Sequence, residues 1–165
     1  MKRPDLILQT IQNNPGIHIR GLIAETSLEN GVIVHYLEKL ERQGKIKSKK
    51  YTRYRRYYSL DVGEDEFDII RNLRKPTKKK IIFYIIVKGS PSFKEIVSST
   101  GKSPSTISWN LSELIKNNVI KKYKKDSTVC YKIKNIELLK HTFQKEFSKL
   151  LDDKKEHSED IFLAL

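Results

Sequence analysis

The clearest hydrophobic pattern in the chain lies at residues 102–120, which read KSPSTISWNLSELIKNNVI. Apolar residues recur there every three or four positions, as on the buried face of an α-helix. Ser103 suits the N-cap and Pro104 the first helical position, where its missing N–H costs nothing. The pattern therefore predicts a short helix with one apolar face and one outward face of small hydroxyls and a tryptophan. The apolar stripe consists of Ile107, Leu111, Leu114 and Ile115, and the outward face of Ser105, Ser108, Trp109 and Ser112.

The residues on either side of this helix predict a helix-turn-helix with a wing. Residues 92–100 form a shorter helical pattern that ends at Gly101. Residues 119–133 follow as two runs of β character around a basic tip. Helix, tight turn, helix and β-hairpin in this order are typical of a winged helix-turn-helix.

The same pattern occurs twice. A shift of about 74 positions aligns the chain with itself, so that Ile33 falls on Ile107 and Leu37 on Leu111. The turn residues and the basic hairpin match as well, which chance coincidence of apolar residues would not readily produce. We therefore expect two copies of one winged-helix unit. The other matched pairs are Ile7 with Ile81, Leu8 with Ile82, Ile11 with Ile85, Ile19 with Phe93, Leu22 with Ile96, Ile23 with Val97, Leu40 with Leu114 and Ile46 with Ile120.

The fold class expected is mostly α with small β-hairpin wings, in two tandem winged helix-turn-helix domains plus a C-terminal helix. In the first unit we expect helices at 5–13 and 17–26, a third helix from Ser27 or Glu29 to Gly44, and a hairpin at 45–60. The expected domains are residues 1–60 and 76–134, with a connecting segment at 61–75 and a C-terminal helix and tail at 135–165.

The two segments outside the domains are each open to two interpretations. The connecting segment lacks the Gly, Ser or Pro richness of a free linker, so we expect a short helix packed on one or both units, which would fix their relation. The apolar stripe of residues 135–153 could fold back on its own chain or pair with a second copy, making the protein a monomer or a homodimer. The apolar end, residues 161–165, either docks or stays loose.

Charge narrows the choice of partner. The 165 residues carry a formal net charge of +13, which favours a polyanion: nucleic acid first and an anionic membrane second. The longest apolar run, residues 81–87, is too short to span a bilayer. The first ten residues read as a helix and not as a signal peptide. We therefore expect a soluble cytoplasmic protein with no membrane partner.

No set of residues suggests catalysis or metal binding. Cys130 is the single cysteine and lies in an apolar strand pattern, which indicates a buried thiol and excludes a Cys-cluster zinc site. The four histidines lack metal-ligand spacing, and there is no phosphate-binding glycine loop. We expect no enzymatic activity, metal or cofactor.

The third helix of each unit supplies the candidates for contact with base edges. Hydroxyls bond to phosphate or base, and asparagine can read adenine. Trp109 could pack on the DNA backbone or a thymine methyl, or cover an apolar patch; its helical angle favours DNA. The first unit has fewer hydroxyls on this face. We therefore expect the third helix of the second unit to contribute more to DNA sequence specificity than that of the first. The candidates are Ser103, Ser105, Thr106, Ser108, Trp109 and Asn110 in the second unit, and Asn30, Gly31, Val34, His35 and Tyr36 in the first.

The hairpins supply the charge for phosphate contacts. The first one crowds seven basic residues with no acid among them, and tyrosines interleave. The alternative interpretation is a solvent-exposed strand edge that lysines keep soluble. So many like charges repel one another, however, which favours binding to phosphate. The basic residues are Lys45, Lys47, Lys49, Lys50, Arg53, Arg55 and Arg56 in the first hairpin, and Lys121, Lys122, Lys124 and Lys125 in the second.

The motif S-x-S-T-I-S-x-x-L-x-x-L followed by N-x-V-I resembles winged-helix regulators of the ArsR and MarR type. Residues 1–134 resemble tandem winged-helix transcription regulators of archaea, through IHIRGLIAETSLENGVIVHYLEKLERQGKI and SFKEIVSSTGKSPSTISWNLSELIKNNVI. The resemblance implies binding to promoter DNA, activation near the basal transcription factors in some relatives, and archaellum operon control as a narrower role. It also implies minor-groove contact by Arg53 or Lys125. Two departures are Gly31, where a polar residue is usual, and Asn110, where many relatives have histidine.

Three functions compete on this basis. Sequence-specific binding of double-stranded DNA in transcription leads. A protein-interaction module of the transcription machinery is second, because winged helices also serve as scaffolds, although the basic wings argue against it. RNA binding is third, because the narrow major groove of A-form RNA excludes a recognition helix and leaves only the wings.

Overall fold

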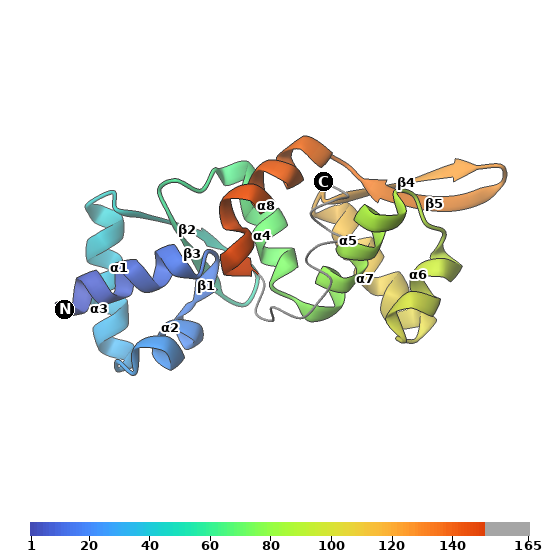
Figure 1. Ribbon diagram of the computed structural model, residues 1–165. Coiled ribbons are helices and arrows are strands. Elements are labelled where there is room, and N and C mark those ends of the chain that lie inside the picture. The colour runs from blue at the N-terminus through green and yellow to red at the C-terminus, as the bar shows by residue number, and fades with distance from the viewer. Residues whose placement is uncertain (151–165) are drawn as a thin grey trace. The chain divides into compact units, whose positions relative to one another are not determined.

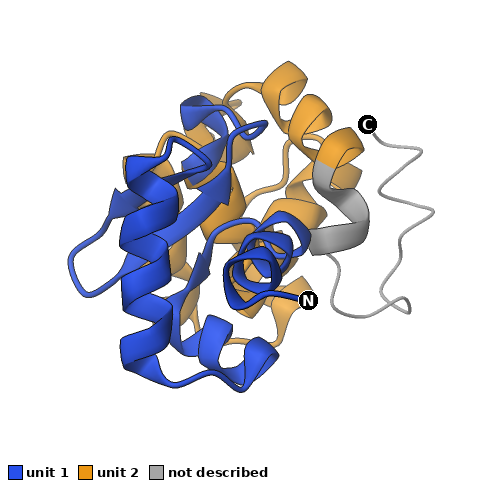
Figure 2. Cartoon of the chain, turned by 90° about the vertical axis from the view of Figure 1, so that its left-hand side faces the viewer, with its two compact units in different colours: residues 1–67, 148–150 blue, residues 68–147, 151–165 orange. Residues whose placement is uncertain are grey.

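The computed structural model describes residues 1–150, and the side chains of residues 1–145. The described residues form two compact units: residues 1–67 with 148–150, and residues 68–147 (Figure 2). Helices dominate both units, and each contains one small antiparallel sheet (Figure 1). The expected fold class is confirmed. No helix within residues 1–150 is long and apolar enough to cross a membrane.

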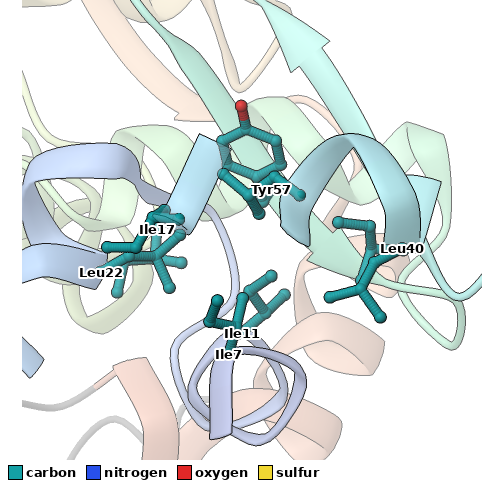
Figure 3. Close-up of a cluster of buried hydrophobic side chains, with 9 residues drawn as sticks. Ile7, Ile11, Ile17, Leu22, Leu40 and Tyr57 are labelled. Atoms are coloured by element: carbon teal, nitrogen blue, oxygen red, sulfur yellow. The ribbon is translucent and has the colours of Figure 1, made fainter. Parts of the chain in front are cut away.

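The first unit packs three helices against a three-stranded antiparallel sheet of order β1-β3-β2. Its core is a cluster of buried apolar side chains that includes Ile7 and Ile11 from the first helix, Leu22 from the second and Tyr57 from the sheet (Figure 3). The three helical positions are ones that the helical periodicity assigns to the interior, whereas the burial of Tyr57 was not predicted. The elements are α1 (Arg3–Asn13), β1 (Ile17–His18), α2 (Ile19–Thr26), α3 (Asn30–Arg42), β2 (Ile46–Lys50) and β3 (Arg55–Ser59).

The prediction that the second helix begins at residue 17 is wrong by two residues. Ile17 and His18 form β1, which pairs with Tyr57 and Arg56 of β3. His18 then caps α2, since its Nδ1 accepts a hydrogen bond from the Gly21 N–H at 2.9 Å. An added Cβ at Gly21 would lie 2.8 Å from the Ile17 side chain, so only glycine lets α2 lie this close to the strand.

The second unit repeats this arrangement with helices α5, α6 and α7 and a two-stranded sheet. Ser92 and Glu95 form a capping box at the start of α6, and Gly101 ends this helix in the left-handed conformation. Ser103 caps α7, with Pro104 at its first position, as predicted. The elements are α4 (Phe67–Leu73), α5 (Pro76–Lys88), α6 (Phe93–Thr100), α7 (Pro104–Lys116), β4 (Ile120–Lys125), β5 (Thr128–Ile133) and α8 (Ile136–Leu150).

The register of the strands is equivalent in the two units. Ile46 pairs with Ser59 in the first hairpin, and Ile120 with Ile133 in the second, which are the same positions under the shift of about 74 residues. The pairing of His18 with Arg56 in the first unit has an equivalent in the second, an isolated bridge between Ser92 and Cys130. The repeat predicted from apolar positions therefore extends to backbone pairing.

The segments outside the two copies are helical in part. The connecting segment forms a 3-10 turn at Glu64–Glu66 followed by α4, and the Phe67 ring stacks on Tyr58 at 3.9 Å between centroids. In α8, Leu139 and Phe143 are buried, and Phe143 lies 5.5 Å from Phe83 of α5. This part of the stripe packs within its own chain. The interpretations of residues 151–165 lie outside the described residues.

Candidate nucleic-acid interface

The outer face of α7 presents hydroxyls and an indole to solvent. Ser103, Ser105, Thr106 and Ser108 are exposed. Trp109 is 60% exposed, which is unusual for the largest apolar side chain of a protein. The Ser103 hydroxyl accepts from the Thr106 N–H at 3.3 Å and so orders the first turn. Five of the six predicted residues of this helix therefore share an accessible surface.

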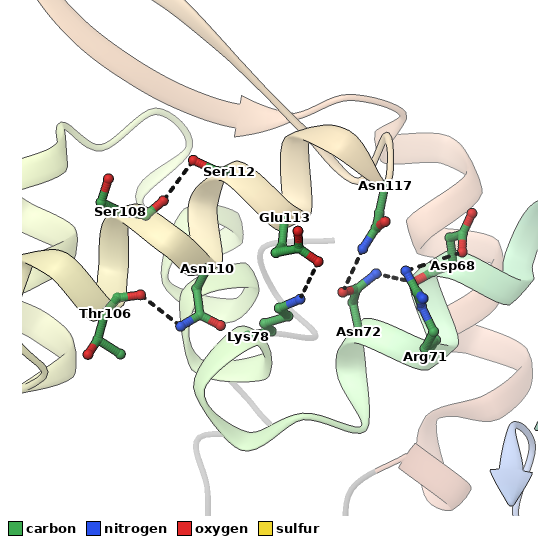
Figure 4. A network of polar contacts seen from close by, with 10 residues as sticks. All are labelled: Asp68, Arg71, Asn72, Lys78, Thr106, Ser108, Asn110, Ser112, Glu113 and Asn117. Atoms are coloured by element: carbon green, nitrogen blue, oxygen red, sulfur yellow. Dashed lines mark hydrogen bonds and ion pairs between the residues drawn. The ribbon is translucent and has the colours of Figure 1, made fainter. Parts of the chain in front are cut away.

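Asn110 is the one predicted residue of α7 that is buried. It is only 6% exposed, and its side-chain amide donates to the Thr106 carbonyl at 2.8 Å (Figure 4). It lies next to Leu111 and three residues after Ile107, so it faces the interior side of the helix. One of its amide hydrogens is used within α7 and the side chain is buried, so we leave it out of the proposed DNA surface.

The corresponding face of α3 is less suited to DNA. Asn30, Gly31 and His35 are exposed, and Val34 is half-buried. Tyr36 packs partly on the core of the first unit and meets the His35 ring edge-on at 5.1 Å. The exposed residues nearer the C-terminus of α3 include the acids Glu38 and Glu41. The exposed basic residues Lys39 and Arg42 lie beside these acids, so this part of α3 carries no net charge.

The basic residues of the first hairpin divide into exposed and engaged groups. Lys45, Lys50 and Arg53 are exposed, with Arg53 in the turn between β2 and β3. Arg55 donates to the Ser48 hydroxyl at 2.6 Å and lies 3.8 Å from the Glu41 carboxylate. The remaining interactions are those of Lys47 with the Val62 carbonyl at 2.9 Å and of Lys49 with the Tyr51 ring at 5.4 Å.

Arg56 differs from the other predicted basic residues of the hairpin because it is buried. It is 6% exposed, and its Nη1 donates to the Gly16 carbonyl at 2.6 Å. Its guanidinium also lies 5.2 Å from the centre of the Tyr54 ring. The side chain therefore ties β3 to the loop before β1, and it is unavailable to a phosphate. Strand alternation places neighbouring residues on opposite faces, so Arg55 and Arg56 cannot both point outward.

The second hairpin is the more open of the two. Lys121, Lys122, Lys124 and Lys125 are all exposed, and the hairpin extends beyond the helices of its unit (Figure 1). Asp126 and Ser127 form its two-residue turn, both with positive φ, at 48° and 67°. Positive φ at both central residues is the type I′ geometry that suits a twisted hairpin. An extended hairpin with four exposed lysines thus belongs to the same unit as the hydroxyl face of α7.

One charged residue behind α7 has no counterpart among the sequence candidates. Lys78 of α5 is 1% exposed, and its Nζ lies 5.3 Å from the centre of the Trp109 ring. The Glu113 carboxylate is 4.0 Å from the same nitrogen (Figure 4). Burial lowers the pKa of Lys78 to about 8. The sequence does contain a signal for this burial. Lys78 precedes the core residues Ile81 and Ile82 by three and four residues, so it lies on the same face of the helix.

Nothing in the described chain resembles a metal centre. Among residues 1–150, no group of three or more His, Cys, Asp or Glu side chains could hold a metal ion. Cys130 is buried and unpaired with another cysteine, as predicted.

Two family models match the chain in tandem. Residues 2–69 match a model described as an N-terminal HTH domain, and residues 74–121 match one described as winged helix-turn-helix DNA-binding. An uncharacterised HTH-type transcriptional regulator of Methanocaldococcus jannaschii, MJ1398, is 27% identical over 127 residues, which are 77% of this chain and 32% of the relative. The chain thus spans about a third of the length of this curated relative.

A solved structure of a winged helix-turn-helix domain is also similar. It is the homodimeric DNA-binding domain of Mb0332 from Mycobacterium bovis, described as a possible ArsR-family transcriptional regulator. The similarity covers 57% of this chain and 97% of that chain, with a TM-score of 0.41 and 14% sequence identity.

Proposed function

From two winged helix-turn-helix units in tandem in one chain, we propose that this protein is a regulator of transcription that binds double-stranded DNA sequence-specifically. The observation that carries the proposal is the second unit's combination of an exposed hydroxyl and indole face on α7 with four exposed lysines on β4. Base edges are read by such side chains in the major groove, and phosphates are held by such lysines. The proposal contains no enzymatic step.

The two units contribute differently. In the second unit, Ser103, Ser105, Thr106, Ser108 and Trp109 read bases, and Lys124 and Lys125 hold phosphates. In the first unit the exposed cations Lys50 and Arg53 act on the backbone, with Lys49 and Arg55 beside them, while Asn30, Gly31, Val34, His35 and Tyr36 offer a smaller reading surface. The net charge of +13 supports an electrostatic contribution to DNA binding.

Selection from random duplex DNA tests the proposal. The best site is then titrated at several salt concentrations. We expect an enriched motif, bound at least ~10³-fold more tightly than scrambled duplex. One uninterrupted motif indicates a monomer that uses both units, whereas a palindrome indicates a homodimer, with α8 as the candidate interface. Steep salt-dependent binding without any enriched motif contradicts the proposal.

A finer form of the proposal is activation at promoters. It rests on the sequence resemblance to archaeal regulators that act near the basal transcription factors. In vitro transcription from a promoter that contains the selected site distinguishes activation from repression, and an archaellum operon promoter tests the narrowest role.

A protein-interaction role is the second candidate, and Glu38 and Glu41 on the outer face of α3 favour it. Two exposed carboxylates suit a basic protein segment better than a phosphate backbone. Replacing both acids with glutamine separates the two roles. DNA binding is expected to stay the same or to strengthen, whereas binding of a basic partner would be lost.

A further inference from the structure

Lys78 is buried in a way that core packing does not explain. Its side chain is 1% exposed, and among the described residues none accepts a hydrogen bond from its Nζ. The Glu113 carboxylate is 4.0 Å away, too far for a hydrogen bond. A methionine would fill similar space without burying a charge. The buried ammonium therefore lowers the stability of the fold, which suggests that it acts on a neighbouring side chain.

The charges that face this ammonium come from two helices and the residue before α5. Burial lowers the pKa of Lys78 most, and the positive charges of Lys75 and of Arg71 in α4 lower it further. Glu113 of α7 acts in the opposite direction and raises the pKa. Together these effects bring the pKa to about 8, so the proton is held at neutral pH and lost under mildly basic conditions.

The remaining neighbour is the indole of Trp109, whose ring centre lies 5.3 Å from Nζ. A cation within about 6 Å of an aromatic ring centre is attracted by the ring's electron density. An indole that is 60% exposed has little other packing to select its rotamer.

We propose that Lys78 is a positioning residue for Trp109, whose indole it holds in one orientation on the outer face of α7. The role of that orientation in reading DNA rests on the proposed function. The positioning itself does not, because it is a property of the free protein.

Intrinsic fluorescence reports this interaction directly, since Trp109 is the only tryptophan of the chain. Emission and anisotropy of the full chain are followed from about pH 6.5 to about pH 9, where ordinary tyrosine and lysine side chains remain mostly protonated. We expect a transition near pH 8 as the ammonium loses its proton and releases the ring.

Three variants make the assignment specific. Lys78→Met removes the charge and abolishes the transition. Glu113→Gln removes an attraction that raises the pKa of Lys78, so the transition moves to lower pH. Lys80→Met, at an exposed lysine of the same helix, leaves the transition unchanged. A flat wild-type profile, or the same transition in Lys78→Met, overturns the positioning role.

Titration of the selected DNA site tests the consequence for recognition. Lys78→Met is expected to raise Kd for that site about 3- to 10-fold, with little change for scrambled duplex. Lys78→Arg, which keeps a cation beneath the ring, restores most of the affinity. An unchanged Kd in Lys78→Met, alongside a large loss in Trp109→Ala, overturns the role in recognition. If selection yields no site, the proposed function fails, and the fluorescence profile still decides whether Lys78 orients Trp109.

Discussion

Asn72 accepts a hydrogen bond from the side-chain amide of Asn117 at 3.2 Å, which joins α4 to the C-cap of α7 (Figure 4). Asn72 is fully buried, and its own amide donates to the Asp68 carbonyl at 2.6 Å. Within the second unit, α4 is thereby fastened to α7.

This bond predicts a measurable coupling. Asn72→Ala should lower the free energy of unfolding by about 1–3 kcal/mol, because it leaves polar groups without partners in the interior. Asn117→Ala removes the same bond from its other end. A double-mutant cycle by urea denaturation should give a coupling of about 0.5 kcal/mol or more. Strictly additive effects would show that the bond does not contribute.

Lys78 predicts a pH-dependent stability. The unfolded chain holds this proton up to its ordinary pKa, whereas the folded chain releases it near pH 8. Between these values the unfolded state binds more protons, so wild-type stability rises with pH through this window. Lys78→Met should therefore be more stable than wild type at neutral pH, by about 1–3 kcal/mol.

Thermal or urea unfolding at several pH values checks this prediction. The advantage of Lys78→Met should shrink as the pH rises from about 8 to about 10. Lys80→Met serves as the control, and it should stay within about 0.5 kcal/mol of wild type at every pH. An advantage that is the same at all pH values would mean that packing, and not the buried charge, is responsible.

The hairpin lysines should act through phosphates. Lys124→Gln together with Lys125→Gln should weaken specific and non-specific DNA binding alike, and should reduce the slope of log Kd against log salt by about 1 for each phosphate that is no longer neutralised. Filter binding or anisotropy across a salt series measures the slope. Arg56→Met should instead destabilise the first unit and leave the slope unchanged, because Arg56 is buried on the Gly16 carbonyl.

The hydroxyl and indole face of α7 should act through bases. Trp109→Ala or Ser105→Ala should weaken binding to the selected site by about 1–3 kcal/mol and affect scrambled duplex less. Ser98→Ala, at an exposed serine of α6, is the matched control. Equal losses on both DNAs would assign these side chains to the backbone.

A substitution at Gly31 can distinguish an effect on the stability of α3 from an effect on DNA binding. Its φ is not positive, and an added Cβ would meet nothing within 4 Å. Gly31→Ala should therefore stabilise α3 by roughly 0.5 kcal/mol. If the helix brings its backbone against DNA, the same change should weaken binding to the selected site. Stabilisation with unchanged affinity would place the N-terminus of α3 away from the DNA.

Sequence by itself determined most of the helices, several of their caps and turns, and the repeat, but not β1 or the His18 cap of α2. These features depend on local interactions: an N-cap such as Ser103 bonds its own first turn, and Gly101 ends a helix because it adopts positive φ cheaply. The periodicity of the apolar residues also identified the core, since a helix can bury only one face. The exposed placement of Trp109 followed from its angle relative to Leu111 and Leu114.

Tertiary structure alone decided which polar residues are available. Arg55 and Arg56 are adjacent arginines of one basic hairpin, yet one lies beside Glu41 at the surface and the other is buried on the Gly16 carbonyl. Asn110 and Lys78 are likewise polar in sequence and buried in the fold. The physical reason is that burial and charge pairing depend on residues that are distant in the chain, which local patterns do not contain. Residue type fixes what a side chain can bind, and the fold decides whether a partner can reach it.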